Sequence, residues 1–314
     1  MKMKLITGQD IIKPQTVFSG VIGQTDVLRQ LRFLTASHDH STPFPTLLLT
    51  GSHGLGKTFL AEKVAKNLNR KYVEINCKMV ETKEELFAVL FSQVAGDQPV
   101  TILFDEAHTI SKEVETVLLS LLAPNHEHKN TLSYKLWDVE FDLRLINVIF
   151  ATTDAFRMFK PLRNRTKTIY FKPYSEKELY RIVQLYAKGL VLECDSMELA
   201  QAARGRARDA YDLAQDLKRV STSTGRNIIR KEDWENLKAI FGIAPLGLKE
   251  VEVDLLKVVG GKGPISCNNI AIHMMINPEN VSEEIEIRPR ELNLIKNTTK
   301  GRVLTEEGRK YLNS

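Results

Sequence analysis

Residues 51–58 read Gly-Ser-His-Gly-Leu-Gly-Lys-Thr, and this stretch decides the fold. The apolar run Leu47–Leu49 precedes it and predicts a buried strand, while apolar residues at helical spacing follow it from Phe59 to Leu68. A strand, a glycine-rich turn and a helix form the context that a phosphate-binding loop requires. The glycines let backbone N–H groups turn toward a phosphate, and the positive end of the helix dipole favours its charge.

Single positions of this loop predict contacts with a nucleoside triphosphate and its metal ion. We expect Lys57 to reach the β- and γ-phosphates and Thr58 to place its hydroxyl on Mg²⁺. A chance glycine-rich turn is the alternative, and both flanks of the motif argue against it. The other nucleotide contacts predicted in this stretch are Gly51, Gly54, Leu55, Gly56 and Phe59.

The composition is that of an ordinary globular protein of two or three domains. The 314 residues are 43% hydrophobic and 26% charged, and the net charge of +5 permits nucleic-acid binding without requiring it. The three cysteines lie far apart and predict reduced thiols. Because no apolar run approaches the ~20 residues that span a bilayer, and no signal peptide is evident, we expect a cytoplasmic protein.

Strand and helix patterns alternate from residue 46 to residue 171. This alternation predicts an α/β fold, with a parallel sheet covered by helices on both faces. Ligands bind at the carboxyl ends of the strands in such sheets, where the glycine loop, Asp105 and Thr152 fall. The predicted strands are Thr46–Thr50, Tyr72–Asn76, Thr101–Asp105, Val148–Thr152 and Thr168–Phe171.

Two further strand ends predict catalytic chemistry. Asp105 and Glu106 end an apolar strand in the Walker B pattern, so we expect Asp105 to hold Mg²⁺, directly or through water, and Glu106 to polarise the attacking water. Thr152 and Thr153 end the next strand and place a hydroxyl between the two nucleotide motifs. There it would orient the water or sense the γ-phosphate, although threonine is also a common strand residue.

Residues 161–165 read Pro-Leu-Arg-Asn-Arg and precede the last predicted strand. An arginine from a neighbouring subunit stabilises the charge of phosphoryl transfer in known ATPases and GTPases. An ordinary surface arginine is the alternative interpretation of each of these two side chains.

The four motifs, in this order, resemble those of AAA+ ATPases, and within that superfamily the chain resembles the RuvB-type motors that drive branch migration of Holliday junctions. The similarity runs from about Pro14 to the carboxyl terminus. It implies nucleotide contacts on the adenine side from Ile22 and Gly23, a catalytic sensor role for Thr153 beside Thr152, and an arginine finger at Arg165. ATP and Mg²⁺ are the implied cofactors.

The resemblance also places residues 204–208, Arg-Gly-Arg-Ala-Arg, on the sensor-2 element. Arg208 falls at the arginine that touches nucleotide within the same subunit, but Arg206-Ala207 stands where the family usually has Gly-Thr. The choice between Arg206 and Arg208 therefore stays open. Such departures are typical of a divergent relative of the kind that a mobile element or phage carries.

Within residues 124–143, the polar stretch 124–130 leads to apolar residues that alternate, among them Leu132, Leu136 and Phe141. This pattern predicts a β-hairpin. The resemblance identifies it with the presensor hairpin, which implies docking of a junction-binding partner protein. Trp137 in this hairpin either stacks on a base or packs on its own sheet or a partner.

The chain is expected to divide into a nucleotide domain at 1–171, a helical lid at 172–242 and a winged-helix domain at 243–314. Ser175 and Glu178 have capping-box spacing at the start of the lid. Helical patterns followed by alternation after Leu292 give the order of a winged helix.

The stretch from Arg288 to Arg302 contains five basic residues and one acidic residue. Such a stretch suits phosphate contacts that do not depend on sequence, or else it is a solvated run of charge. The resemblance places Lys300-Gly301-Arg302 at a DNA-contacting motif of the family. The predicted DNA contacts are Lys296, Lys300 and Arg302.

We therefore expect an ATPase that works as a homo-oligomeric ring, a hexamer by resemblance, and moves DNA junctions. A clamp loader or helicase loader acting on a protein partner is the main alternative, and the winged helix disfavours it. A superfamily-2 helicase would need a second RecA-like domain, which the last 170 residues cannot supply. A non-catalytic binding module is opposed by the intact Lys57, Asp105, Glu106 and Arg165.

Overall fold

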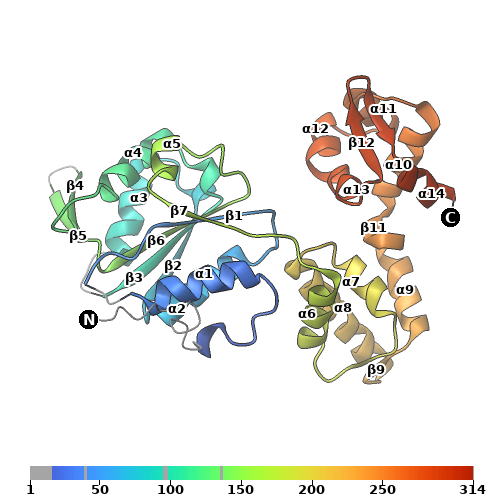
Figure 1. Cartoon of the computed structure of the whole chain (residues 1–314), viewed down its shortest axis with the longest axis horizontal. Coiled ribbons are helices and arrows are strands. Elements are labelled where there is room, and N and C mark those ends of the chain that lie inside the picture. Colours follow the sequence, from blue (N-terminus) through green and yellow to red (C-terminus); the bar gives the residue numbers. More distant parts are fainter. Residues whose placement is uncertain (1–15, 39–40, 95–97, 135–136, 314) are drawn as a thin grey trace, which may run out of the picture. The chain divides into compact units, whose positions relative to one another are not determined.

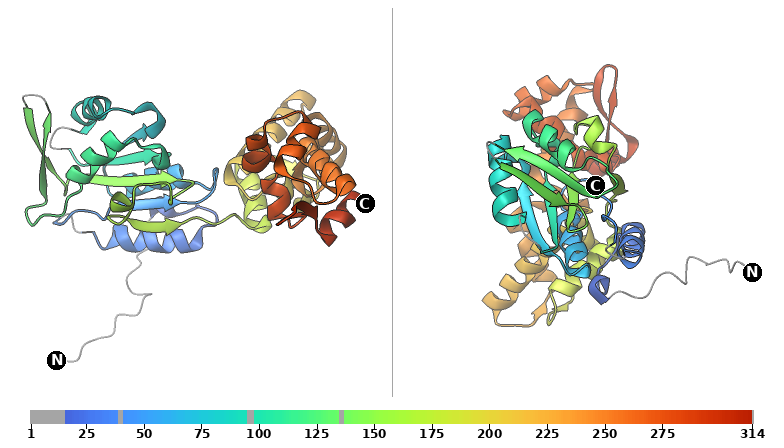
Figure 2. Two further views of the ribbon diagram at one scale, coloured as in Figure 1. Left: turned by 90° about the horizontal axis from the view of Figure 1, so that it is seen from above. Right: turned by 90° about the vertical axis from the view of Figure 1, so that its left-hand side faces the viewer.

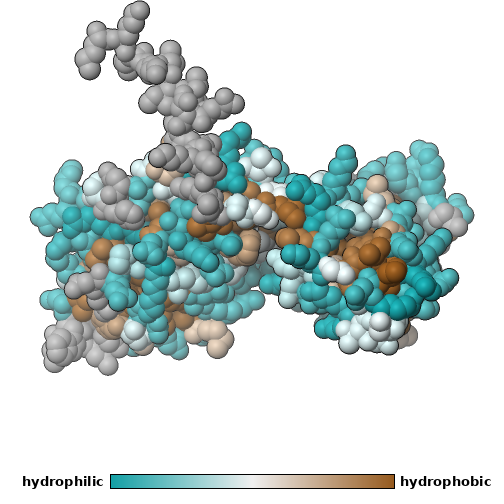
Figure 3. All heavy atoms as spheres, turned by 90° about the horizontal axis from the view of Figure 1, so that it is seen from below, coloured by the Kyte–Doolittle hydropathy of each residue, from teal (hydrophilic) through white to brown (hydrophobic). Residues whose placement is uncertain are grey.

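The computed structural model describes residues 16–38, 41–94, 98–134 and 137–313 (Figure 1). The chain forms two compact units, 1–174 and 175–314, and each is described by itself. Among the described residues, no helix has the length and apolar character needed to cross a bilayer. Hydrophilic side chains cover most of the face in Figure 3, with a few hydrophobic patches between them.

A five-stranded parallel sheet forms the centre of the first unit, with the strand order β2-β3-β6-β1-β7. Each of the five predicted strands is present, and each end lies within two residues of the prediction. The α/β fold class is therefore confirmed. The strands are β1 (Leu47–Thr50), β2 (Lys71–Asn76), β3 (Val100–Asp105), β6 (Ile146–Thr152) and β7 (Lys167–Tyr170).

Helices cover both faces of this sheet (Figure 2). Alternate strand residues enter different cores: Leu48 packs with helices α3 and α4, whereas Leu47 and Leu49 pack with α1 and α2. Because both faces are buried, the strands are continuously apolar rather than alternating. The helices and helical turns of this unit are η1 (Thr16–Phe18), α1 (Thr25–Ala36), α2 (Lys57–Asn67), η2 (Cys77–Met79), α3 (Lys83–Val89), η3 (Leu90–Val94), η4 (Ala107–Thr109), α4 (Lys112–Leu121) and α5 (Lys160–Arg163).

The hairpin predicted within residues 124–143 is present, because β4 (Lys129–Tyr134) and β5 (Trp137–Asp142) pair antiparallel. The polar stretch at residues 124–130 leads into β4 and does not separate the two strands. Leu132 and Phe141 point into the core beside α4. Asn130 anchors the hairpin, since its side-chain amide donates to the carbonyls of Leu121 and Ala123 at 2.7 and 2.8 Å. Leu136 and the side chain of Trp137 lie outside the described part of the chain.

The second unit begins with the helices predicted for the lid. Ser175 and Glu178 form the expected capping box at the start of the first helix. Two short strands, which were not predicted, pair in parallel between the helices. Two residues are too few to leave an alternating pattern in the sequence. The elements are α6 (Glu176–Tyr186), β8 (Val191–Leu192), α7 (Ser196–Ala202), α8 (Ala207–Thr224), β9 (Ile228–Ile229) and α9 (Lys231–Phe241).

The rest of this unit has the element order of a winged helix. Its core is built around Leu255, Leu256 and Val259 of α10. A two-stranded wing follows the helices, with Thr298 opposite Gly301 at its tip. The elements are β10 (Ile243–Ala244), η5 (Pro245–Gly247), β11 (Leu248–Lys249), α10 (Glu250–Lys262), α11 (Cys267–Met274), α12 (Pro278–Asn280), η6 (Val281–Ile285), α13 (Ile287–Glu291), β12 (Ile295–Thr298), β13 (Gly301–Leu304) and α14 (Glu306–Asn313).

A buried ion pair joins the lid to the winged helix. Arg204, just before α8, donates two hydrogen bonds of 2.6 and 2.7 Å to Glu252 of α10, and a third of 2.9 Å to the Gly247 carbonyl. The two charged side chains are 12% and 3% exposed. Gly247 has φ +71°, and a Cβ there would lie 2.1 Å from the Gln201 carbonyl oxygen. The joint therefore requires a glycine and a satisfied charge pair.

Candidate nucleotide and DNA sites

The carboxyl ends of β3, β6 and β1 lie side by side, because these strands are neighbours in the parallel sheet. They bring Asp105, Thr152 and the glycine loop to one edge of the sheet. The loop is tied to β6 by a hydrogen bond of 3.3 Å from the Gly51 amide to the Thr152 carbonyl. Three segments that lie as far apart in sequence as Gly51 and Thr152 thus meet at the sheet edge where the sequence analysis predicts the nucleotide.

The glycine loop is closely packed against the strand end of β7. Gly51 has φ +149°, and a Cβ there would lie 2.9 Å from both the Cβ and the carbonyl oxygen of Phe171. Lys57 begins α2, and its Nζ donates to the carbonyls of Gly51 and Ser52 at 2.7 and 2.8 Å. The ammonium group is therefore held inside the loop, where phosphate oxygens would replace these carbonyls as its acceptors.

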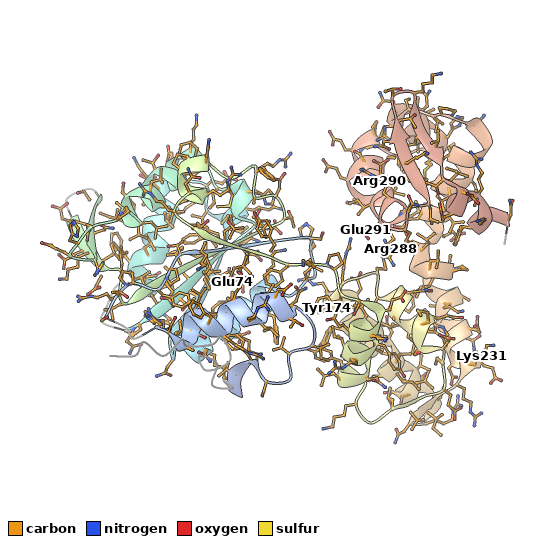
Figure 4. The ribbon with its side chains drawn as sticks, viewed as in Figure 1. Glu74, Tyr174, Lys231, Arg288, Arg290 and Glu291 are labelled. Carbon is orange, nitrogen blue, oxygen red and sulfur yellow. The ribbon has the colours of Figure 1, made fainter. Side chains whose placement is uncertain are left out.

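The other predicted nucleotide contacts have different environments. The Leu55 side chain is buried in the core beside α1 and α2, so only its backbone faces the loop, and Phe59 is half-exposed on α2. The Leu55 carbonyl accepts a 3.1 Å hydrogen bond from the Tyr174 hydroxyl. Tyr174, labelled in Figure 4, is the last residue of the first unit, and its contact with the loop was not predicted.

The predicted adenine-side segment is a turn with two left-handed residues. Gly23 has φ +70° and Gln24 has φ +49°. The Gln24 side chain binds the backbone of Lys172 twice, donating to its carbonyl at 2.6 Å and accepting from its amide at 3.3 Å. This pair holds the half-buried Ile22 next to the segment that follows β7.

The residues predicted to hold Mg²⁺ lie close together. The Thr58 hydroxyl is 3.5 Å from Asp105 Oδ2, and Asp105 Oδ1 accepts from the Glu106 amide at 3.0 Å. A hydroxyl and a carboxylate fit a small hard cation that keeps several waters and takes its other ligands from phosphate. In the ranges that the structure describes, no group of three or more His, Cys, Asp or Glu residues forms an all-protein metal site.

Glu106 lies between two imidazole rings. Its Oε1 is 3.5 Å from His53 Nδ1 in the glycine loop, and its Oε2 is 3.4 Å from His108 Nδ1. The same nitrogen of His108 lies 3.0 Å from the Thr152 hydroxyl, so His108 connects the strand ends of β3 and β6. Thr153 is half-buried beside them. The contacts of His53 with Glu106 and of His108 with Thr152 were not predicted, because each joins residues from different strand ends.

Negative charge gathers at this edge of the sheet. Cys77 follows β2, and burial raises the pKa of its thiol to about 12, with the charges of Asp105 and Glu106 adding to the effect. A third negative charge, on the Cys77 thiolate, would be unfavourable beside these two carboxylates. The same field favours a divalent cation.

The two arginines of residues 161–165 have different surroundings. Arg163 is half-buried, donates to the Ala155 carbonyl at 2.9 Å and lies over the Phe156 ring. Arg165 is exposed and donates to the Leu119 carbonyl. Only Arg165 of this pair is exposed, as a finger that reaches a neighbouring subunit must be.

The sensor-2 candidates belong to the second unit. Arg206 is the residue before α8, and Arg208 is exposed in the first turn of that helix. That one of these two arginines touches the nucleotide stays a prediction.

The basic stretch from Arg288 to Arg302 is not one continuous surface. Arg302 pairs with Glu286 at 2.9 Å and is only 18% exposed, and Arg290 approaches the same carboxylate. Arg288 pairs with Glu291 at 3.4 Å, on the helix turn labelled in Figure 4. Lys296 and Lys300, on and beside the wing strands, are exposed. Glu286 lies just outside the basic stretch in sequence, which is why the charge count missed this pairing.

One match to a known family falls in each unit. Residues 47–174 match the "ATPase family associated with various cellular activities (AAA)", and residues 245–313 match the "RuvB C-terminal winged helix domain". The chain is a RuvB-type AAA ATPase. The predicted family and the prediction of an ATP-hydrolysing enzyme are thereby confirmed.

The chain is similar over nearly its whole length to proteins that share one name. This RuvB-type chain is 28% identical over 98% of its residues to a protein from Fervidobacterium nodosum, and 27% identical over 96% to one from a Wolbachia strain. Both are named "Holliday junction branch migration complex subunit RuvB", and the matches cover 90% and 94% of those proteins.

Solved structures of Thermotoga maritima RuvB have the same fold. One described as a Holliday junction branch migration motor has a TM-score of 0.76 and 25% identity, over 93% of this chain and 95% of that one. A variant of the same protein has a TM-score of 0.79 and 24% identity, over 96% and 99% of the two chains.

Proposed function

We propose that this RuvB-type ATPase uses ATP hydrolysis to drive branch migration at four-way DNA junctions, in DNA recombination and repair. The proposal rests on the presence of two kinds of site in one chain. Lys57, Asp105 and Glu106 lie at one edge of the sheet, and a RuvB-type winged helix exposes Lys296 and Lys300. The full-length similarity to branch-migration subunits supports it.

The chain's residues divide the chemistry of ATP hydrolysis among them. Lys57 would leave the loop carbonyls to bind the β- and γ-phosphates, while Thr58 and Asp105 would hold Mg²⁺. The cation would neutralise charge on the phosphates. Glu106 would polarise the attacking water, with His53 and His108 fixing its carboxylate, and the Thr152–Thr153 pair would sense the γ-phosphate.

Arg165 would complete the site of the next subunit, so activity requires a ring, which we propose to be a hexamer. The lid, at residues 172–242, would move with nucleotide state, and either Arg206 or Arg208 would touch the nucleotide. The winged helix, at 243–314, would bind the DNA backbone through Lys296 and Lys300, with Arg302 supporting the wing. The β4–β5 hairpin would dock a junction-binding partner protein.

The decisive experiment measures the ATPase rate alone and with linear duplex, forked or four-way DNA. We expect stimulation by duplex arms, and movement of a labelled junction that depends on hydrolysis. Stimulation that appears only with a protein partner, without any DNA movement, would favour the loader alternative.

The subunit contribution of Arg165 has its own test. Arg165→Ala should abolish hydrolysis with ATP still bound, and mixing it with Lys57→Ala should restore part of the rate, because each variant supplies the group that the other lacks. Arg157→Ala is the matched control, since Arg157 is an exposed arginine close in sequence that pairs with Asp154. An unrestored mixture would contradict a finger that acts between subunits.

A further inference from the structure

The winged-helix domain has two surfaces of opposite character. The wing is basic, with Lys296 and Lys300 exposed. Residues 264–287, which include α11, α12 and η6, contain four glutamates and no lysine or arginine. In helix-turn-helix relatives the second helix of this pair enters the major groove. Here that helix carries negative charge.

Three of these glutamates face solvent. Glu279, Glu283 and Glu284 are exposed, whereas Glu286 is buried against Arg302. Affinity for duplex DNA arises largely from cations that neutralise phosphates, so three exposed carboxylates oppose DNA at this face. The α12–η6 helix is therefore suited to a cationic partner.

A hollow with a mixed lining lies beside Glu279, which stands between Pro278 and Asn280 of that lining in sequence. It has a volume of about 630 Å³, and its lining consists of the apolar residues Ala271, Ile272, Met275, Ile276 and Pro278 and the asparagines Asn268, Asn277 and Asn280. Ile272 is 71% exposed and Met275 is 93% exposed. Two large, exposed apolar side chains beside a hollow are more typical of a surface that contacts another molecule than of a helix end that faces only water.

The backbone of Met275 strengthens this argument. It ends α11 with φ +55° and ψ +44°, the left-handed conformation that glycine or asparagine usually supplies at this position. Its amide closes the helix by bonding to the Ile272 carbonyl at 3.3 Å. The end of α11 depends on the backbone conformation of Met275 and not on its exposed side chain, so a glycine at this position would end the helix at least as well. The methionine side chain is available for a contact outside the domain, and its flexibility suits it to an irregular apolar surface.

We propose that the face formed by α11, α12 and η6 binds a protein segment that presents apolar side chains flanked by lysines or arginines. The apolar side chains would fill the hollow around Ile272 and Met275, and the cations would lie against Glu279, Glu283 and Glu284. An amphipathic basic helix in a groove has this chemistry. DNA at the wing and a protein segment at this face would then bind the same domain at once.

The test uses the full chain and a synthetic 18-residue peptide with leucines at positions i, i+3, i+4 and i+7 and lysines elsewhere. Fluorescence anisotropy at moderate salt should show saturable binding. Met275→Gly and Ile272→Ser should each weaken it at least tenfold, as should Glu283→Lys with Glu284→Lys. Ile240→Ser is the matched control, because Ile240 is 74% exposed on α9 of the lid and should leave binding unchanged.

Met275→Gly separates contact from folding, because it removes the side chain while easing the backbone. Equal binding by that variant, or by a peptide of the same composition with scattered leucines, would overturn the proposal, as would absence of peptide binding. Displacement of the peptide by duplex DNA would show that this face binds nucleic acid. An assembly of the chain that Met275→Gly dissociates, with no peptide bound, would instead assign the face to a second copy.

Discussion

The joint between lid and winged helix makes a quantitative prediction about stability. Replacing Arg204 by methionine keeps an unbranched side chain but removes the guanidinium cation from the Glu252 carboxylate, which is 3% exposed. Removing one partner of a buried pair costs about 3–5 kcal/mol. Unfolding of the second unit should reflect this loss, since both residues belong to that unit.

The chain supplies a reporter for this unit alone. It has two tryptophans, and in a Trp137→Phe background only Trp234 remains. Trp234 is 1% exposed in α9, where its indole donates to Glu198 at 2.8 Å, so unfolding should change its fluorescence strongly. With a urea m-value of about 2 kcal/mol per molar, the loss corresponds to a midpoint lower by about 1.5–2.5 M.

The matched control is Lys257→Met on the same helix as Glu252. Lys257 pairs with Asp254 at 2.9 Å, but the two side chains are 63% and 51% exposed, so its loss should cost less than about 0.5 kcal/mol. Adding Glu252→Gln to Arg204→Met should recover a large part of the loss, because glutamine removes the orphan charge and still accepts from the Lys249 amide. A midpoint shift below about 0.5 M for Arg204→Met, or one equal to the control, would refute the reasoning.

Three further predictions concern the nucleotide site and the wing. Glu106→Gln should bind ATP with unchanged affinity yet release phosphate at least about 100-fold more slowly, and normal turnover would contradict its role. Lys300→Ala should reduce the salt dependence of DNA binding by about 0.9 in the log–log slope, whereas Arg302→Ala should chiefly lower the thermal stability of the wing, where its partner is Glu286. Burial raises the pKa of the Cys77 thiol from 9.0 to about 12, so this thiol should resist alkylation at pH 8.5 in the folded protein and react on unfolding. The free energy of unfolding should include the full contribution of the neutral thiol below pH 9 and lose it as the pH rises toward 12. Urea titrations across that pH range would detect the loss.

The nucleotide half of the chain was predictable because its signals are local. Residues 51–58 carry the loop chemistry in one stretch, and strands buried on both faces are apolar along their length. The strand ends then identify Asp105 and Thr152 as neighbours. The contacts of His53 with Glu106 and of His108 with Thr152 were not predictable, since each joins residues from different strand ends, whereas His108 and Glu106 are two residues apart in the sequence.

The winged helix shows where charge counting fails. A count over residues 288–302 treats every cation as available, but ion pairs form across the fold. Glu286 lies 16 residues from Arg302 and becomes its partner only when the wing folds back on η6 and α13. Exposure and pairing, which the sequence does not state, separate the cations that can reach a phosphate from those that hold the domain together.

The ion pair between Arg204 and Glu252 also concerns how a change of bound nucleotide could move the DNA-binding domain. Arg204 forms an ion pair with Glu252 of α10 in the winged helix, and the sensor-2 candidates Arg206 and Arg208 follow it within four residues. Two backbone hydrogen bonds hold the connecting turn: the Arg204 amide donates to the Gln201 carbonyl at 2.9 Å, and the Arg206 amide donates to the Ala203 carbonyl at 2.9 Å. A force on either sensor arginine therefore acts on a turn that is bonded to both the lid and the wing-bearing domain. Since a buried, bidentate pair resists separation, the lid and the winged helix should respond to nucleotide as one body, and the flexible step in the motor should lie elsewhere in the chain.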